Sequence, residues 1–299
     1  MNRIIIIQGP TASGKSTLAI ELAQKINAPI VSADSRQFYK EMSIGTAKPS
    51  KNEMDQAKHY FIDTHSINDP SLTSAGYMKL GREQIAKLFH EGASDIVVTG
   101  GSGMFIDALI DGLHDSPSDA ELRDALHEEW SKNGIETLLK ELESKDPESY
   151  STIDTNNPMR VLRALEMIRV SGKTLKEIRE IPKDGINYPI QRFVISWKRE
   201  DLYTRINMRV HQMIDEGLFD EVKELPLKES ILLQNTVGYK EWIPYFSEES
   251  SYDETISMIQ KNSRNYAKRQ ETWLKRYSDL ICLNPYDAVS LKEQLLSYI

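Results

Sequence analysis

The sequence predicts an α/β fold, in which helices flank a parallel sheet and a helical segment is inserted, and three observations carry this prediction. Short runs of β-branched residues alternate with helical apolar spacing, as in βαβ units. A glycine-rich loop joins the first such run to the first helix. Between residues 115 and 150 the composition changes to eleven acids and four bases with helical leucine spacing. We therefore expect a core made of residues 1–114 and 188–299, with a helical insertion at 115–187.

Composition limits the function classes. The 299 residues carry 37 bases and 45 acids, a net charge of −8, so a nucleic-acid partner would have to bind a local basic patch. The single cysteine, Cys282, excludes an internal disulfide and a cysteine-rich zinc module. The first apolar run is only four isoleucines, so we expect no signal peptide, and no apolar run approaches the roughly 20 residues that a membrane helix needs. We expect a cytoplasmic protein with no membrane role, and nothing implies a protein partner.

The first strand, Arg3–Gln8, leads into a phosphate-binding loop. The loop sequence GPTASGKS has the spacing G-x-x-x-x-G-K-[ST] and precedes a helix whose apolar residues include Leu18 and Leu22. In such a loop backbone N–H groups surround a phosphate, the lysine reaches over it and the last hydroxyl is free for Mg²⁺. The expected phosphate-binding residues are Gly9, Pro10, Thr11, Ala12, Ser13, Gly14, Lys15 and Ser16, with Ser16 as the metal ligand.

The second strand, residues 29–33, ends on Asp34. Because ligands collect at the carboxyl ends of parallel strands, we expect Asp34 beside the phosphate-binding loop. Its carboxylate could hold the hydration shell of Mg²⁺, act as a general base, or cap the next helix. Arg36 and Gln37, which follow, suit a phosphate and a base edge, although either could face solvent.

A further strand, residues 95–99, ends in Gly100-Gly101-Ser102-Gly103. An ATPase would be expected to place an acid there to organise Mg²⁺ and water, so the glycines count against ATP hydrolysis. They would let a flat or bulky ligand approach the backbone, or would simply form a tight turn.

The next helix is expected to begin at Pro158 with Asn157 as its cap. Its apolar face, formed by Val161, Leu162, Leu165 and Ile168, should be buried, whereas Arg160 and Arg163 share a turn and point together, as residues of a solvated face often do. After the strand at 192–197, a helix from Asp201 carries Arg205 and Arg209 on one face. If that strand neighbours the first, the helix directs both guanidinium groups toward the same phosphate.

The C-terminal helix combines two faces. Ile259, Tyr266, Trp273 and Tyr277 form a stripe that is more typical of core than of a base-stacking platform. Residues 261–277 hold six bases and one acid, a local charge of +5. At that density we favour contact with a nucleic-acid backbone over a solvated face, through Lys261, Arg264, Lys268 and Lys275.

Eight short motifs occur along the chain, and their order is characteristic of one family. GPTASGKST, SADSRQFY, GTAKP, GGSGMF, NNPMRVLRALE, SGKTL, VGYKE and YAKRQETW follow one another along nearly the whole chain, which thereby resembles the tRNA dimethylallyltransferases (tRNA isopentenyltransferases). The resemblance is to the bacterial type, because eukaryotic relatives carry a zinc finger that one cysteine cannot build. It implies a P-loop-kinase-like core and transfer of a dimethylallyl group from its diphosphate to N6 of the adenine just 3′ of the anticodon.

The resemblance also implies site residues. Asp34, Thr11, Lys15 and Arg209 would be catalytic, the phosphate-binding loop and Arg209 would hold dimethylallyl diphosphate, and Mg²⁺ would be the cofactor. Residues expected to contact the tRNA anticodon stem-loop are Asp34, Ser35, Arg36, Gln37, Gly101, Ser102, Arg123, Met159, Arg160, Val161, Leu162, Arg163, Asn235, Thr236, Val237, Gly238, Tyr239, Lys240, Arg264 and Lys268.

Three other functions stay open at this point. An adenylate isopentenyltransferase acting on free nucleotide, or a small-molecule kinase, would share the phosphate-binding loop but would not need the basic C-terminal helix. A non-enzymatic nucleic-acid-binding module would leave that loop and Asp34 unexplained.

Overall fold

The computed structural model describes residues 2–69, 72–114 and 117–299. The chain forms two compact units, one made of Met1–Ile110 and Asn187–Ile299, the other of Asp111–Ile186. The expected insertion, 115–187, differs from the second unit by four residues at one end and one at the other. Among the described residues no helix is both long and apolar enough to cross a bilayer.

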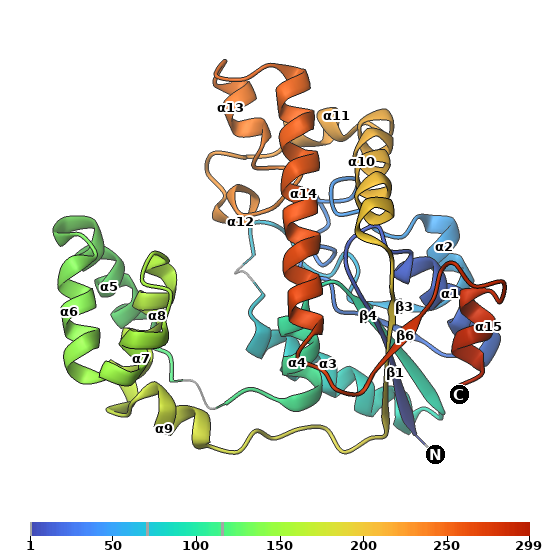
Figure 1. Cartoon of the computed structure of the whole chain (residues 1–299), viewed down its shortest axis with the longest axis horizontal. Helices are drawn as coiled ribbons and strands as arrows, with labels where there is room; N and C mark the ends of the chain where they lie inside the picture. Colours follow the sequence, from blue (N-terminus) through green and yellow to red (C-terminus); the bar gives the residue numbers. More distant parts are fainter. Residues whose placement is uncertain (1, 70–71, 115–116) are drawn as a thin grey trace. The chain divides into compact units, whose positions relative to one another are not determined.

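The first unit is built on a six-stranded parallel sheet in the order β3-β2-β4-β1-β5-β6 (Figure 1). The central strand β1 therefore pairs with β4 on one side and β5 on the other. In open parallel sheets, ligands bind outside the carboxyl ends of the strands where the strand order reverses, which here is the end of β1. The strands are β1 (Arg3–Gln8), β2 (Ile30–Ser32), β3 (His59–Tyr60), β4 (Asp95–Gly100), β5 (Ile190–Ile195) and β6 (Leu280–Leu283).

Helices cover both faces of this sheet and extend beyond its carboxyl end. Figure 1 shows α1 and α15 on one side of the sheet and α3 and α4 on the other, with α10 beside α14. The helices of this unit are α1 (Lys15–Ile26), α2 (Lys51–Gln56), α3 (Ser74–His90), α4 (Gly103–Asp111), α10 (Arg199–Asp215), α11 (Leu218–Lys223), α12 (Ile231–Gln234), α13 (Trp242–Phe246), α14 (Tyr252–Leu274) and α15 (Leu291–Leu296).

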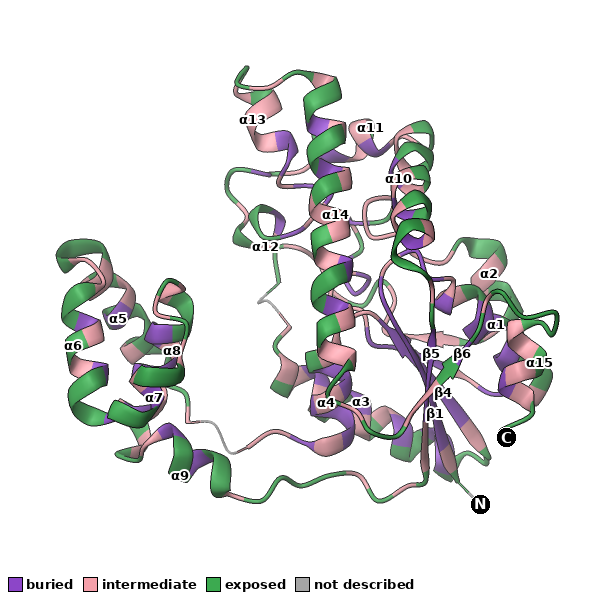
Figure 2. Ribbon diagram, in the orientation of Figure 1, coloured by how far each residue is buried: buried purple, intermediate pink, exposed green. Residues whose placement is uncertain are grey.

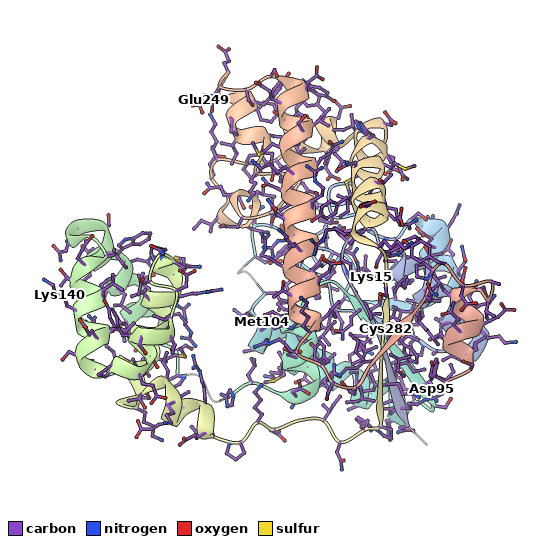
Figure 3. All side chains as sticks on the ribbon, in the orientation of Figure 1. Lys15, Asp95, Met104, Lys140, Glu249 and Cys282 are labelled. Atoms are coloured by element: carbon purple, nitrogen blue, oxygen red, sulfur yellow. The ribbon has the colours of Figure 1, made fainter. Side chains whose placement is uncertain are left out.

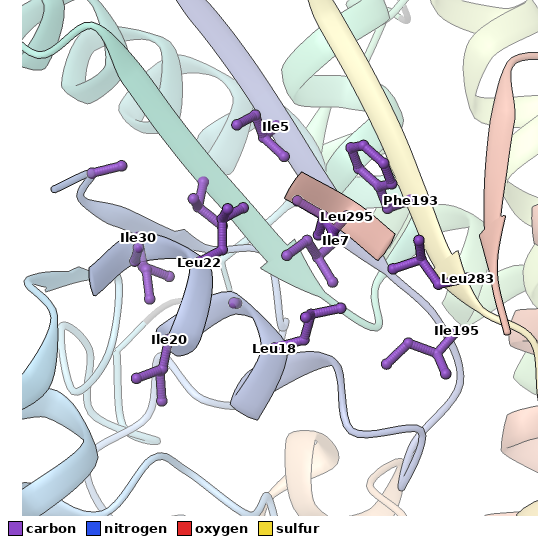
Figure 4. Close-up of a cluster of buried hydrophobic side chains, with 14 residues drawn as sticks. Ile5, Ile7, Leu18, Ile20, Leu22, Ile30, Phe193, Ile195, Leu283 and Leu295 are labelled. Carbon is purple, nitrogen blue, oxygen red and sulfur yellow. The ribbon is translucent and has the colours of Figure 1, made fainter. Parts of the chain in front are cut away.

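The inner strands are buried on both faces, which explains why they read as continuous apolar runs (Figure 2). Ile5 and Ile7 of β1 pack with Leu18 and Leu22 of α1, and Leu295 of α15 joins the same cluster (Figure 4). Each such side chain stabilises the fold by about 1.5–3 kcal/mol relative to an exposed one. This core fixes the sheet edge that carries the candidate site.

The second unit is entirely helical and has its own core. Buried leucines of α5, α6 and α8 pack together, and Asn157 caps α8 as expected, accepting a hydrogen bond from the Arg160 amide. The helices are α5 (Ala120–Asn133), α6 (Glu136–Lys145), α7 (Pro147–Thr152), α8 (Pro158–Ser171) and α9 (Leu175–Glu180).

Candidate functional site

The phosphate-binding loop lies where expected, between β1 and α1. Gly14 precedes α1 with φ of 94°, a left-handed conformation that favours glycine, and Ala12 adopts φ of 62°. A non-glycine residue held in this region carries strain of about 1–3 kcal/mol, which the surrounding contacts must maintain. Because α1 begins at Lys15, the free N–H groups of its first turn are available to an anion at the loop.

Neighbouring elements hold the loop from three sides. The Trp197 indole donates to the Ser13 carbonyl at 2.8 Å, and Arg205 Nε donates to the Ala12 carbonyl at 2.8 Å while its guanidinium lies over the Trp197 ring. Gln270 Oε1 of α14 accepts a hydrogen bond from the Thr11 amide at 2.9 Å. Arg205 thus binds the backbone of the loop through Nε, and together with Lys15, Ser16 and Arg209 it lines a cavity beside the loop.

Four polar residues expected to act together do line one cavity, of about 240 Å³. They are Thr11, Lys15, Asp34 and Arg209, and Ser16 lines it as well. Lys15, at the start of α1, is buried (Figure 3). Further lining residues are Ser35, Arg36, Gln37, Asn235, Thr236, Val237, Gly238, Lys240, Tyr266, Arg269 and Gln270.

The charges in this cavity affect one another. Burial and, to a smaller extent, the neighbouring Arg209 guanidinium together lower the pKa of Lys15 to about 8, against the opposing effect of Asp34. Burial also lowers the pKa of Arg209, while the Asp34 carboxylate raises it. Two cations thus converge beside one carboxylate, an arrangement that favours binding of a multiply charged anion.

Asp34 does not cap a helix, since the next helix, α2, begins only at Lys51. Its Oδ1 accepts from the Arg36 amide at 3.0 Å, which forms a local turn. Arg36 Nε in turn donates to Thr236 Oγ1 at 2.8 Å, which connects the loop after β2 to the turn at 235–238. Ser102 Oγ accepts from the Ser35 amide at 3.0 Å. The loop that carries Asp34 is therefore fixed on two sides.

Some side chains that were expected to contact tRNA form hydrogen bonds within the protein instead. The Gln37 amide donates to the carbonyls of Thr46 and Ala47, so a base contact by this group would require those bonds to break. Tyr239 is buried and its hydroxyl donates to Glu221, so this side chain is not exposed for the expected tRNA contact. Arg264 donates to Asn207 of α10 at 2.6 Å, where α10 and α14 pack.

The second unit carries the remaining candidates. Val161 and Leu162 are buried in its core, so these two side chains are not exposed for the expected tRNA contact either. Met159 and Arg160 are exposed.

Arg123 and Arg163 both pair with the buried Glu166, at 2.7 and 2.8 Å. Burial alone would raise the pKa of Glu166, but the hydrogen bonds from these two arginines outweigh it and hold the pKa below its usual range. Both arginines therefore have a structural role that the sequence pattern does not indicate.

Sequence reasoning also missed residues of α14. Tyr266 and Trp273 were expected in the core, but both line cavities, and Tyr266 borders two of them. Arg269 and Gln270 border the same two cavities. The second cavity, of about 270 Å³, lies against Gly101–Gly103. The segment YAKRQETW, which contains these four residues, was the only signal available.

Comparisons with known proteins agree with one another. The family model described as IPP transferase matches residues 37–277. Among curated proteins, tRNA dimethylallyltransferase 2 of Parabacteroides distasonis is 37% identical over 300 residues, which cover both chains completely. The tRNA dimethylallyltransferase of Clostridioides difficile is 39% identical over 304 residues, 99% of this chain and 97% of the relative.

Solved structures are similar over the full length. The tRNA isopentenylpyrophosphate transferase of Bacillus halodurans superposes with a TM-score of 0.72 at 30% identity, covering 100% of this chain and 94% of the other. The corresponding protein of Staphylococcus epidermidis gives 0.71 at 34% identity, covering 100% and 97%.

Proposed function

The chain belongs to the IPP transferase family, and we propose that it transfers a dimethylallyl group from dimethylallyl diphosphate to N6 of the adenine just 3′ of the anticodon in tRNA, releasing diphosphate. The observation that carries the proposal is the cavity in which a phosphate-binding loop, two cations and Asp34 meet. The cytoplasm is the expected compartment, since tRNA is the proposed substrate.

The phosphate-binding loop and Arg209 would hold the donor. Lys15 and Arg209 meet the negative charge of the diphosphate, and the N–H groups at the start of α1 add further donors. The same groups stabilise the charge that develops on the leaving group. Thr11, which lines the cavity, offers a hydroxyl to the same diphosphate.

Asp34 would act as the base that takes a proton from the acceptor, the adenine amine. The lone pair of an exocyclic adenine amine is delocalised into the ring, so N6 becomes a useful nucleophile only as it loses a proton. N6 attacks the first carbon of the dimethylallyl group, the bond from that carbon to the diphosphate oxygen breaks, and the N6 proton passes to Asp34. For this the adenine must leave the stack of the anticodon loop and enter the cavity.

The residues present fit a magnesium ion. Ser16 at the start of α1 and Asp34 line one cavity, and Mg²⁺ sites of this kind use one or two protein oxygens together with phosphate oxygens and water. Groups of three or more metal-binding side chains are absent from the described part of the chain, so a site built from protein ligands alone is not expected. When bound, the ion would neutralise charge on the diphosphate.

The proposal is tested by incubating the protein with radiolabelled dimethylallyl diphosphate and either bulk tRNA or AMP. Label should appear in tRNA. Incorporation into AMP alone would identify an adenylate isopentenyltransferase instead. The basic helix α14 favours tRNA, because a free nucleotide has no need of it.

We expect kcat/KM for the prenyl diphosphate to fall above pH 8. Below its pKa of about 8, Lys15 carries the charge that attracts the diphosphate, and above it the ammonium is lost from the free enzyme. A pH–rate profile measures this limb. Lys15→Arg keeps its charge and should remove the limb, whereas an unchanged limb in that variant would assign it to another group.

Exposed lysines on α14, and at the residue directly after its C-terminus, should contribute to the affinity for tRNA. Replacing Lys261, Lys268 and Lys275 by alanine is expected to weaken tRNA binding and to reduce the slope of log affinity against log salt by about one unit per lost phosphate contact. Binding measured from about 50 to 200 mM salt tests this. The matched control replaces Lys25, Lys51 and Lys87, which are also exposed, and should leave the slope unchanged. Equal slopes for both triple variants would show that the α14 lysines face only solvent.

A further inference from the structure

Gln270 connects two loops of the site that are far apart in the sequence. It is 8% exposed and lies on α14. Its Oε1 accepts from the Thr11 amide at 2.9 Å, and its Nε2 donates to the Gly101 carbonyl at 2.9 Å. One side chain therefore spans from the phosphate-binding loop to the loop after β4.

The loop after β4 is itself attached to the residues around Asp34. Ser102 Oγ accepts from the Ser35 amide and donates to Ser35 Oγ, both at 3.0 Å. The Ser102 amide donates to the Ala33 carbonyl at 3.3 Å. Gln270 is thus the link in a chain of hydrogen bonds from the proposed donor site to the proposed base.

The space around Gln270 is closely fitted. A Cβ on Gly101 would lie 2.3 Å from Gln270 Nε2, so this contact excludes any other residue at position 101 unless Gln270 moves. One turn earlier on α14, Ala267 is buried against Ala12 of the phosphate-binding loop and Ile206 of α10. The backbone that carries Gln270 is therefore fixed, and the oxygen and the nitrogen of its side-chain amide are both held in place.

We propose that Gln270 is a positioning residue, which sets the distance between the phosphate-binding loop and the loop that carries Asp34. This inference rests on the proposed function. Transfer requires the electrophilic carbon of the donor and N6 of the acceptor to come within about 3–3.5 Å in line, and a misplacement of 1 Å can cost about 10²-fold in rate. Both polar atoms of the Gln270 side chain bind the two loops, so its loss should affect the rate of transfer more than the binding of either substrate.

Three variants test this. Gln270→Met keeps the length of the side chain and removes both hydrogen bonds. Gln270→Asn keeps the amide oxygen and nitrogen, but its side chain is one methylene, about 1.5 Å, too short to span the two loops. The matched control is Gln260→Met, also on α14, which removes a hydrogen bond to His211 away from the cavity.

We expect kcat to fall about 10- to 100-fold in both Gln270 variants, with KM for the prenyl diphosphate and for tRNA within about threefold of the unmodified protein. Gln260→Met should keep full kcat, and thermal unfolding should show all three variants folded at the assay temperature. Full activity of Gln270→Asn would overturn the inference, since polarity alone would then suffice. An increase in KM without loss of kcat would also overturn it. Inactivity of the unmodified protein would contradict the proposed function itself.

Discussion

Asp34→Asn is expected to lower turnover by about 10²- to 10⁴-fold, the range in which a general base contributes. Asparagine keeps the shape of the side chain and its oxygen can still accept from the Arg36 amide, so the loop should hold its conformation. It cannot take a proton at neutral pH, and the adenine amine then has no acceptor for the proton it must lose. Single-turnover rates measure the loss, and the affinities for tRNA and prenyl diphosphate should change little by comparison.

A Mg²⁺ titration separates the two roles open to this carboxylate. If Asp34 acts as the base, raised Mg²⁺ leaves the slow rate of Asp34→Asn unchanged. If it orients the metal through its water shell, raised Mg²⁺ restores much of the rate. Asp55→Asn, at an exposed position, is the control and should behave as the unmodified protein. Strong rescue by metal, or near-normal activity of Asp34→Asn, would remove Asp34 from the role of base.

Lys15→Met should lower kcat/KM for the prenyl diphosphate by about 10²- to 10³-fold, the effect of removing one group that stabilises developing negative charge. Lys15 is buried and lines the cavity, so its interaction with an anion is strengthened by the low dielectric. Methionine fills much of the same volume without the charge. Steady-state kinetics with varied prenyl diphosphate measure the effect.

Two observations would make that result specific. Lys25→Met replaces an exposed lysine near the other end of α1 and should leave kcat/KM unchanged. The affinity of Lys15→Met for tRNA in the absence of donor should also be retained, since the acceptor is proposed to bind through other residues. A loss of less than about fivefold in kcat/KM would contradict the assignment of Lys15 to the diphosphate.

The sequence predicted the fold class and the core of the site because both depend on local patterns. The spacing of glycines, lysine and serine in residues 9–16 specifies a loop conformation, and the parallel sheet then brings Asp34 to the same edge. The start of α8 at Pro158 also follows from a local cap, Asn157. The expectation that a helix after a strand next to the first would bring Arg209 to the phosphate site also agrees with the structure, since β5 pairs with β1 and Arg209 lines the cavity.

The remaining features depend on long-range contacts that periodicity does not encode. Glu166 is one position on an otherwise ordinary helix, yet besides Arg163, one turn before it on α8, it binds Arg123 of α5, which is 43 residues away in the sequence. Tyr266 lies on the apolar stripe of α14. This helix extends beyond the sheet (Figure 1), and the Tyr266 side chain lines a cavity. Gln270 binds two loops that lie 259 and 169 residues away in the sequence, so no local pattern predicts its role.

The most direct test of the account is a product balance in a reaction that contains only this protein, Mg²⁺, dimethylallyl diphosphate and tRNA. Nucleosides from the digested tRNA are identified by mass spectrometry, and diphosphate and ADP are quantified with ATP absent and then present. The account predicts one diphosphate released for each N6-dimethylallyl adenosine formed at the position 3′ of the anticodon, with no need for ATP and no ADP formed when it is added. Stoichiometric ADP release, or diphosphate release without a modified adenosine, would contradict it.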